Sequence, residues 1–496
     1  MQENQGKCKE EHTIKAKTGS ALHTDLYQLN MMQTYINKGL ESKKAVFDMF
    51  FRELPFGNGY AIYAGLEQII NYLTGLKFNE DDLKYLETLG FNDGFIDFLK
   101  DFRFSGDVYS LQEGEVIFPR EPVLTVEARL VEALLIETAL LNIFNHETLI
   151  ATKASRIKQV VPDKKIAEFG ARRGHGLGAS LYGTRAAYIG GFDGTSLVEA
   201  GKKFSIPVVG TMSHAFVQSF ADEVSAFRAY AEENIGNIIL LVDTYNTLKS
   251  GVPNAIKVAK ELKKRDITVN GIRLDSGDLA YLSKQARMML DESGFPEIKI
   301  IASSDLDEYV ISELEMQKAA IDMYAVGTRV ITAYEQPSLG GIYKLVEVID
   351  QNQRIPKIKV SDNPEKNVLP GRKRLYRIIN RNSKKAEADY ITRYEEKLPQ
   401  FGKELLLFDP ITPWKKKTIK DYESIELQKI VISNGERCHS SPTVEQIRNY
   451  RENALSLLWE EHKRKSNPQE YYVDLSLDLW HLKNKMIEEK KIEYNS

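Results

Sequence analysis

The sequence predicts an α/β protein whose middle part is a (β/α) barrel. Short apolar runs rich in β-branched residues recur after Lys165, with stretches of helical spacing between them. Strands that alternate with helices are typical of parallel βα units. The seven runs occupy residues 166–169, 188–193, 206–211, 238–243, 269–275, 298–303 and 323–328. Seven such runs favour a closed or irregular barrel over a doubly wound sheet, although spacing alone leaves both open.

The segments on either side of these runs have other patterns. Residues 1–20 are polar and mixed in charge, which predicts a loose tail. Ala45 to Phe51 predicts a strand, Gly106 to Val126 predicts β-structure with turns, and Glu132 to Ile150 predicts a helix buried between layers. After Lys344 the β-like alternation returns. We therefore expect four parts: 1–20, 21–150, 151–345 and 346–496.

Composition narrows the class of protein. The 496 residues carry 67 Lys and Arg against 70 Asp and Glu, a net charge of -3, which argues against a nucleic-acid partner recognised by bulk charge. The two cysteines, Cys8 and Cys438, lie far apart, as in a protein of a reducing compartment. The polar first residues predict no signal peptide, and no apolar run is long enough to predict a bilayer span. These features predict a cytoplasmic protein with no membrane partner.

Polar residues end nearly every predicted barrel strand, and such ends converge on one mouth. Arginines there bind phosphate or carboxylate bidentately, backbone N–H groups before helices cradle phosphate, and carboxylates accept from sugar hydroxyls or hold magnesium through water. Together they predict an anionic, phosphorylated sugar ligand. A single polar strand end is more often a helix N-cap. The candidates of the three kinds are Arg172, Arg173 and Arg273; Ser303–Ser304 and Gly327–Thr328; and Asp275 with Asp278.

One histidine follows the run at 206–211. His214 stands after a small polar turn and before a stretch of helical spacing, Ala215 to Phe220. Enzymes with α/β barrels keep their chemistry on such loops. The alternative is a partly buried histidine without function.

Two glycine motifs compete with this interpretation. Gly174 to Ala179 matches G-x-G-x-x-A after a strand, the dinucleotide fingerprint, but the two arginines directly before it are atypical. Gly178 to Thr184 has P-loop glycine spacing, with Thr184 where the lysine is required. The second motif is therefore rejected, and the first is the weaker hypothesis.

Several stretches together resemble the nicotinate phosphoribosyltransferase family, from about residue 20 to about residue 366, and the resemblance fades after that. RLDSGD and the histidine stretch are specific in combination. The stretches are TDLYQ from Thr24, FRELPFGNGY from Phe51, EFGARR from Glu168, GFDGTS from Gly191, GTMSHAF from Gly210, VDTYNT from Val242, RLDSGD from Arg273 and QPSLGGIYKL from Gln336.

The resemblance implies a type II phosphoribosyltransferase fold, in which an irregular α/β barrel, the catalytic part at 151–345, lies beside an α/β sandwich domain. That domain would consist of residues 21–150, completed in part by 346–496. It also implies a homodimer with shared active sites. The activity implied is synthesis of nicotinate mononucleotide and pyrophosphate from nicotinate and phosphoribosyl pyrophosphate, the first step of NAD salvage from nicotinate. ATP would be the co-substrate and Mg²⁺ the cofactor.

The same resemblance implies roles for single residues. His214 would be the phosphorylated histidine, and Arg273 and Asp275 would act beside it. The metal ligands stay open, with Asp243 and Asp278 as candidates acting through water. A neutral Ser196, where the related nicotinamide enzyme has an acid, favours a carboxylate-bearing base. The nicotinate contacts would be Tyr27, Thr211, Arg273, Phe169 and Ser196; the phosphoribosyl pyrophosphate contacts would be Arg172, Asp275, Ser303, Gly327 and Thr328.

Three other functions are weighed against this one. A nicotinamide phosphoribosyltransferase differs only in its base. A phosphate-binding aldolase or isomerase commonly needs a lysine or a carboxylate base at a strand end, and no lysine ends any of the runs. A catalytically silent binding protein is disfavoured by the presence of Arg273, Asp275 and His214.

Overall fold

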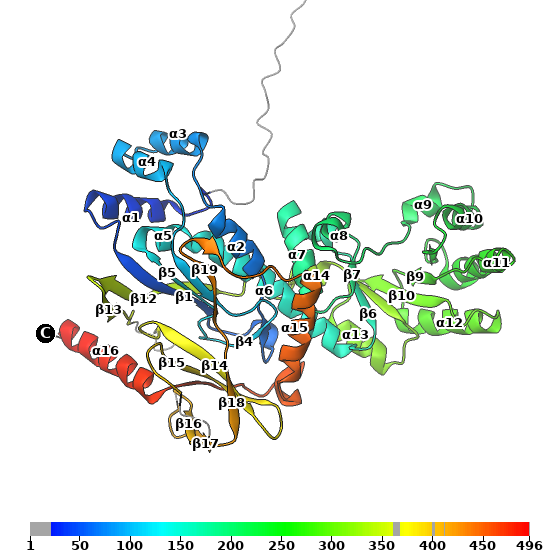
Figure 1. Ribbon diagram of the computed structural model, residues 1–496. Helices are drawn as coiled ribbons and strands as arrows, with labels where there is room; N and C mark the ends of the chain where they lie inside the picture. The colour runs from blue at the N-terminus through cyan, green and yellow to red at the C-terminus, as the bar shows by residue number, and fades with distance from the viewer. Residues whose placement is uncertain (1–20, 361–367, 399–401, 411, 496) are drawn as a thin grey trace, which may run out of the picture.

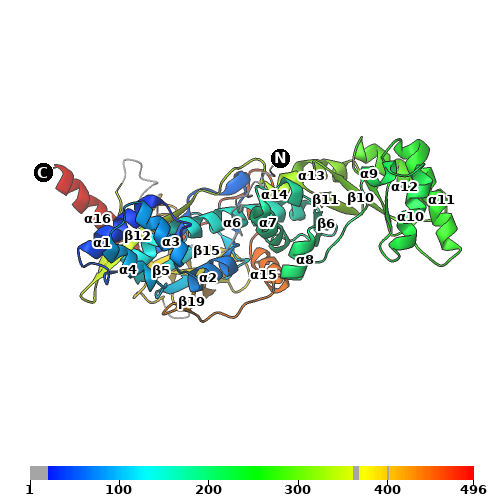
Figure 2. The same cartoon turned by 90° about the horizontal axis from the view of Figure 1, so that it is seen from above.

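The computed structural model describes residues 21–360, 368–398, 402–410 and 412–495. The molecule is elongated, with sheets and the C-terminal helix at one end and helices α9–α12 at the other (Figures 1 and 2). The predicted loose tail, residues 1–20, lies outside the described residues. No helix in the described ranges is long and apolar enough to span a bilayer.

A seven-stranded antiparallel sheet combines strands from both ends of the chain. Its order is β13-β12-β1-β5-β3-β19-β20. Three of these strands come from the N-terminal part and four from the chain beginning at Gly341, so the predicted joint domain is present. The bounds are β1 Lys44–Phe51, β3 Asp107–Ser110, β5 Leu124–Arg129, β12 Gly341–Asp350, β13 Gln353–Pro356, β19 Lys429–Ser433 and β20 Glu436–Arg437.

Further β-structure flanks this sheet. A four-stranded sheet has the order β18-β14-β15-β21. Strands β16 and β17 form a separate two-stranded sheet, and so do β2 and β4. The bounds are β2 Ala61–Ile62, β4 Val116–Ile117, β14 Lys373–Asn380, β15 Ala386–Arg393, β16 Leu405–Phe408, β17 Lys416–Ile419, β18 Tyr422–Glu426 and β21 Val473–Leu475.

A six-stranded parallel sheet forms the barrel part. Its order is β7-β6-β11-β10-β9-β8, and all five pairings are parallel. Beyond β7, Val208 makes one parallel bridge to Thr195. The predicted α/β class with parallel βα units is therefore confirmed. The bounds are β6 Lys165–Glu168, β7 Gly194–Thr195, β8 Ile239–Leu241, β9 Gly271–Leu274, β10 Lys299–Ser304 and β11 Met323–Val326.

Helices cover both regions. The longest of them, α6, has buried residues on most of its faces and lies between the sheets, as predicted. Thr152 on α6 accepts from the Ile62 N–H at 2.9 Å, which ties it to β2. The bounds are α1 Leu26–Asn37, α2 Leu66–Thr74, α3 Glu80–Thr88, α4 Asp93–Lys100, α5 Leu130–Leu135, α6 Glu137–Val160, α7 Leu177–Ile189, α8 Val198–Phe204, α9 His214–Gln218, α10 Glu223–Glu233, α11 Val252–Lys263, α12 Leu279–Glu292, α13 Glu308–Met316, α14 Thr328–Ile331, α15 Val444–Ser456 and α16 Leu477–Asn495.

Two of the seven predicted strands are wrong. In the run at 188–193, Tyr188 and Ile189 close helix α7, and the strand is Gly194–Thr195. A buried helix end and a short buried strand have the same apolar composition, so periodicity did not separate them. The run at 206–211 is irregular except for the bridge at Val208, whose side chain is 50% exposed. Its apolar residues therefore do not form a buried strand within one chain.

Candidate active site

Side chains from the carboxyl ends of the parallel strands meet at one edge of the sheet, as predicted. Arg273 near the end of β9 lies at the centre. Its Nε donates to Ser303 on β10 at 2.8 Å, its Nη1 to Thr211 at 3.1 Å, and its Nη2 to Asp275 at 2.7 Å. A guanidinium has five N–H donors, so these three bonds leave two N–H groups. Arg273 is therefore both fixed in place and able to bind a further acceptor.

The carboxylate of Asp275 is held in its charged form. Burial works to raise its pKa, but hydrogen bonds from Ser303 and Arg273 and the positive charge of Arg273 bring the pKa below its ordinary value. Its backbone N–H donates to Asp243 at 2.9 Å. Asp275 is consequently an anion at neutral pH with its backbone and side chain both fixed.

His214 begins helix α9, where the Ser213 hydroxyl accepts from the Phe216 N–H at 3.3 Å. The ring is held at one nitrogen, because Nδ1 lies 3.2 Å from the Thr244 hydroxyl. The other nitrogen, Nε2, lies 3.7 Å from Asp275 and 3.9 Å from Asp243, beyond hydrogen-bond reach. With the side chain 41% exposed, Nε2 is accessible to a reacting group.

Asp243 is the most deeply buried acid of this cluster, with a side-chain exposure of 1%. Its Oδ2 accepts from the Ser276 hydroxyl at 2.6 Å and from the Asp275 N–H. Its Oδ1 is buried and has no hydrogen-bond partner among the described residues. A buried carboxylate oxygen without a partner is costly, so Oδ1 is a candidate ligand atom.

The loop after β6 and the loop after β11 lie against each other. The Phe169 N–H donates to Val326 O at 2.8 Å, and a Cβ on Gly170 would lie 2.5 Å from Gly327 O. Only glycine therefore permits this approach. The Phe169 ring lies 5.9 Å from the Arg273 guanidinium, within cation–π range. These contacts place Phe169 and Gly327 at the same edge as Arg273.

Glu168, at the end of β6, accepts hydrogen bonds from three segments at this edge of the sheet. Its buried carboxylate accepts from the Gly170 N–H and from the hydroxyls of Thr184 at 3.0 Å and Thr195 at 2.9 Å. Burial raises the pKa of Glu168, and the three hydrogen bonds oppose that rise. The residue thus connects the ends of β6 and β7 with helix α7.

Four predicted site residues lie outside this cluster in the single chain. Tyr27 is on α1, which Figures 1 and 2 show at the opposite end of the molecule from β9 and β10. Arg172 is exposed on the turn Ala171–Arg173, and Ser196 is exposed after β7. Asp278 caps α12, accepting from the Tyr281 N–H at 3.0 Å. For Asp278 the helix-cap alternative is the one that the geometry supports.

Two further residues received no role from the sequence. Thr244 and Ser276 follow predicted strands and contact His214 and Asp243, respectively. Their positions directly after an aspartate at a strand end, in VDTYNT and RLDSGD, were the available signal. Hydroxyl residues at such ends are common as caps, so sequence alone did not distinguish them.

Comparisons with known proteins give three family matches along the chain. The N-terminal domain of nicotinate phosphoribosyltransferase (NAPRTase) matches residues 22–145, the NAPRTase family residues 164–390, and the nicotinate phosphoribosyltransferase C-terminal domain residues 372–483. The similarity thus extends beyond residue 366, where the sequence resemblance had been expected to fade.

Single relatives cover nearly the whole chain. A nicotinate phosphoribosyltransferase of Bacillus subtilis (strain 168) is 52% identical, over 95% of this chain and 96% of that protein. One of Dictyostelium discoideum is 34% identical, over 92% and 87%, respectively. The crystal structure of human nicotinic acid phosphoribosyltransferase superposes with a TM-score of 0.81 at 28% identity, covering 93% of this chain and 99% of that one.

Proposed function

The chain belongs to the nicotinate phosphoribosyltransferase family and is an enzyme of NAD salvage, and from this premise we propose how its strand-end cluster works. The pyridine nitrogen of nicotinate bonds to the anomeric carbon of phosphoribosyl pyrophosphate, and the bond from that carbon to the pyrophosphate oxygen breaks. The observation that carries the proposal is Arg273, held by three partners and left with two N–H groups.

We assign the nicotinate carboxylate to those two N–H groups. A planar guanidinium matches a carboxylate bidentately, and the bonds to Ser303 and Asp275 stop Arg273 from turning away. Thr211, bonded to Nη1 at 3.1 Å, borders the same acid group. Phe169, 5.9 Å from the guanidinium, supplies a ring face for the pyridine. The base would thereby be aligned for attack before the reaction begins.

The phosphoribosyl group is assigned to the neighbouring strand ends. Asp275 would accept from ribose hydroxyls, for which its charged form is suited. Ser303 at the end of β10 and the backbone of Gly327 and Thr328, where α14 begins, would hold the phosphate. Arg172, exposed beside this edge, would neutralise the leaving pyrophosphate.

The residues present fit a magnesium ion bound mainly through water and substrate. Asp243 Oδ1 is a buried carboxylate oxygen without a partner. No cluster of three ligating side chains occurs among the described residues, which suits an ion that keeps several waters and takes few protein ligands. When bound, Mg²⁺ would neutralise charge on the pyrophosphate. Asp278, engaged in capping α12, is the weaker of the two candidates.

His214 is assigned as the residue that ATP phosphorylates. If Nδ1–H donates to Thr244, Nε2 carries the lone pair. Nε2 would then bond to the γ-phosphorus as its bond to the β–γ bridging oxygen breaks and ADP leaves. The phosphoryl group adds roughly -1.5 to -2 charges beside Asp243 and Asp275, which are 3.9 and 3.7 Å from Nε2. That repulsion would favour its hydrolysis after product forms.

Preference for nicotinate over nicotinamide is assigned to the charge of the site. Arg273 offers donors to an anion, and Ser196 places a neutral side chain after β7. An acid there would repel the carboxylate. Turnover with each base at equal concentration tests this assignment, because a nicotinamide enzyme would use the amide at least as well.

We further assign the active form to a homodimer in which each site takes Tyr27 from the partner subunit. Tyr27 is 51% exposed on α1, at the end of the molecule away from Arg273. The barrel part in turn leaves Leu177, Val198 and Val208 exposed at 89%, 71% and 50%. Exposed apolar side chains on both parts are typical of surfaces that meet a partner.

A labelling experiment tests the histidine assignment. Wild-type protein incubated with γ-labelled ATP should carry acid-labile, base-stable phosphate, and His214→Ala should carry none while keeping slow, ATP-independent synthesis. Thr244→Val is the sharper variant, because the ring stays while the bond that fixes Nδ1 is lost; label should form more slowly. Label that persists in His214→Ala, or ATP stimulation that survives in it, would contradict the assignment.

A further inference from the structure

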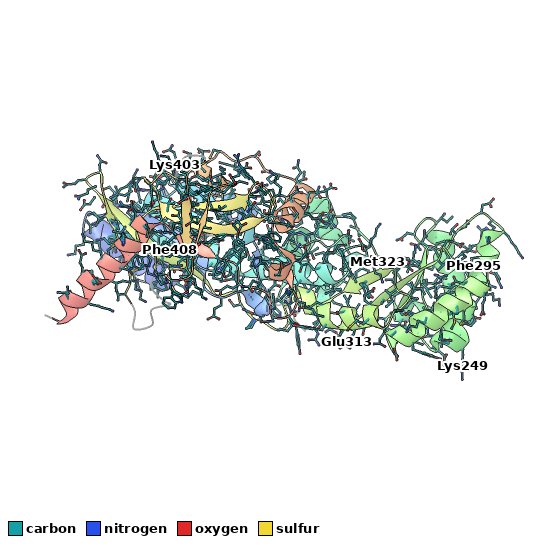
Figure 3. All side chains as sticks on the ribbon, turned by 90° about the horizontal axis from the view of Figure 1, so that it is seen from below. Lys249, Phe295, Glu313, Met323, Lys403 and Phe408 are labelled. Atoms are coloured by element: carbon teal, nitrogen blue, oxygen red, sulfur yellow. The ribbon has the colours of Figure 1, made fainter. Side chains whose placement is uncertain are left out.

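A cavity lies at the sheet end of the molecule, away from the strand-end cluster. It has a volume of about 380 Å³ and is bordered by β1, β14, β15, β21 and α16. Asp409 and Pro410, which follow Phe408, line it. Figure 3 shows Phe408 at one end of the molecule and Phe295, after α12, at the other, with Met323 of the parallel sheet between them. The cavity is therefore separate from the site that carries His214 and Arg273.

Two positive side chains line the cavity without an acid partner. Arg120, on the loop between β4 and β5, has a buried Nε with no hydrogen-bond partner in the described part of the chain. Lys483, on α16, makes no ion pair within the same ranges. Burial and the charge of Arg120 both lower the pKa of Lys483. By contrast, Lys373 beside them is paired with Asp48 at 2.7 Å.

The backbone fixes Arg120 in this unpaired position. Its φ is 71°, in the left-handed region that side chains rarely adopt. Its N–H donates to Phe51 O at 2.8 Å, which holds the turn against β1. Strained residues that persist are common at ligand clamps. Two neighbouring cations that make no ion pair are the arrangement that a doubly charged anion would neutralise.

An acidic part and an apolar wall complete the cavity. Asp474 on β21 is 3% exposed, and burial, with Asp409 nearby, raises its pKa to about 7. Carboxyl groups of this kind accept hydrogen bonds from amino groups. Phe118 and Tyr471 line the wall and stack at a centroid distance of 3.8 Å, and the Tyr471 hydroxyl donates to Asp389 at 2.9 Å. The wall is therefore rigid and suits a planar ring.

From these features we infer that the cavity binds a nucleoside monophosphate whose base carries an exocyclic amino group. The phosphate dianion would pair with Arg120 and Lys483, the amino group would donate to Asp474 and Asp409, and the base would lie on the apolar wall. The volume lies within the range of small-molecule sites. Nicotinate mononucleotide fits less well, because its base presents a carboxylate to the two aspartates. The site would make the enzyme responsive to a mononucleotide other than its own product.

Titration calorimetry with adenosine monophosphate tests the inference. Wild-type enzyme should bind it, and Lys483→Met, which removes the charge and keeps most of the length of the side chain, should bind at least tenfold more weakly. Lys485→Met is the matched control, because Lys485 lies on the same helix with its side chain 73% exposed, paired with Glu489 at 3.8 Å; it should bind as the wild type does. Arg120→Met is a second variant, in case Lys483→Met unfolds.

Two competitor ligands define the class. Inorganic phosphate and nicotinate mononucleotide should each bind this cavity at least tenfold more weakly than adenosine monophosphate. Equal affinity of adenosine monophosphate for wild type and Lys483→Met, with Arg120→Met also unchanged, would overturn the site. Absence of any binding would also overturn it. Inorganic phosphate or nicotinate mononucleotide binding as tightly as adenosine monophosphate, in a manner sensitive to Lys483→Met, would overturn recognition of the amino-bearing base.

Discussion

Two arginines on β-strands each form an ion pair with an aspartate, one in the candidate active site and the other in the folded core. Arg273, near the end of β9, bonds to Asp275 and has a side-chain exposure of 15%. Arg377, inside β14, bonds to both oxygens of Asp389, to Glu115 and to Val116 O, at an exposure of 1%. Arg273 retains two N–H groups without a partner on a partly exposed side chain, and Arg377 is enclosed by acceptors from two segments, 115–116 and β15. Unused donors at an accessible strand end, and not the ion pair itself, distinguish the site.

The largest expected effect is the loss of stability when the buried Arg377 is removed. Arg377→Ala leaves Asp389 and Glu115 buried without their counter-charge, so the free energy of unfolding should fall by about 3–5 kcal/mol. Chemical denaturation measures it. The matched control is Arg374→Ala on the same strand, whose ion pair to Glu426 is partly exposed at 3.7 Å; that change should cost about 0–1 kcal/mol. Equal losses in both variants would contradict the role given to burial.

The next effect is the loss of affinity for nicotinate when Arg273 is removed from the site. Arg273→Ala should raise the KM for nicotinate by the equivalent of about 2–4 kcal/mol, because the carboxylate loses its partner in a partly desolvated site. Thermal stability should change little by comparison. Arg273→Lys is the control, since it keeps the charge but not the two parallel donors, and it should recover only part of the affinity. An unchanged KM in folded Arg273→Ala protein would exclude the assignment.

A smaller effect concerns Asp474, whose carboxyl has a pKa of about 7 against an ordinary value of 3.8. Its titratable neighbours are Asp409 and Tyr390. Between pH ~4 and ~7 the folded state binds more protons than the unfolded state, so this group lowers stability as pH rises. In Asp474→Asn, the decrease in the free energy of unfolding between low and high pH should be smaller by on the order of 2 kcal/mol. Melting temperatures at pH 5 and pH 8 measure it, and a variant that loses as much stability as wild type would disprove it.

The smallest expected effect is a partial recovery of activity when two weakly active variants form hybrid dimers. Tyr27→Ala and Arg273→Ala proteins should each be weakly active, and mixing them should restore up to about a quarter of wild-type activity, because one of the two sites in a hybrid dimer is intact and hybrids make up about half the dimers. Activity is followed over time after mixing, with subunit exchange monitored separately. Exchange without rescue would show that Tyr27 does not enter the partner's site.

The strand-end cluster was predictable because parallel strands bring their carboxyl ends to one edge whatever lies between them. Arg273, Asp275 and Ser303 meet for that reason, whereas Thr211 and His214 reach the same edge from an irregular segment and the start of α9. Which of the ends are helix caps was not predictable, since Asp278 and Asp243 look alike in sequence and only one caps a helix. The substrate was predicted from the resemblance to the family, and not from the spacing of the site residues.

The rest depended on contacts between distant segments. The strand predicted at 188–193 is mostly helix end and turn, because burial alone does not set the backbone conformation. The cavity that holds Arg120 and Lys483 is lined by stretches from near residue 48 to residue 483. Neither cation stands in a motif, and no local pattern signals that both lack acid partners.

The interleaving of the seven-stranded sheet has a consequence for synthesis of the chain. Strand β3 pairs with β5 on one side and with β19 on the other, where Ser110 lies opposite Lys429. A ribosome completes β1, β3 and β5 long before it reaches β19, and the whole parallel sheet is made in between. During that interval β3 has an open edge with unpaired backbone groups, the kind of edge that recruits strands from other chains. Completion of the C-terminal segment closes this edge and ends the period of exposure to aggregation.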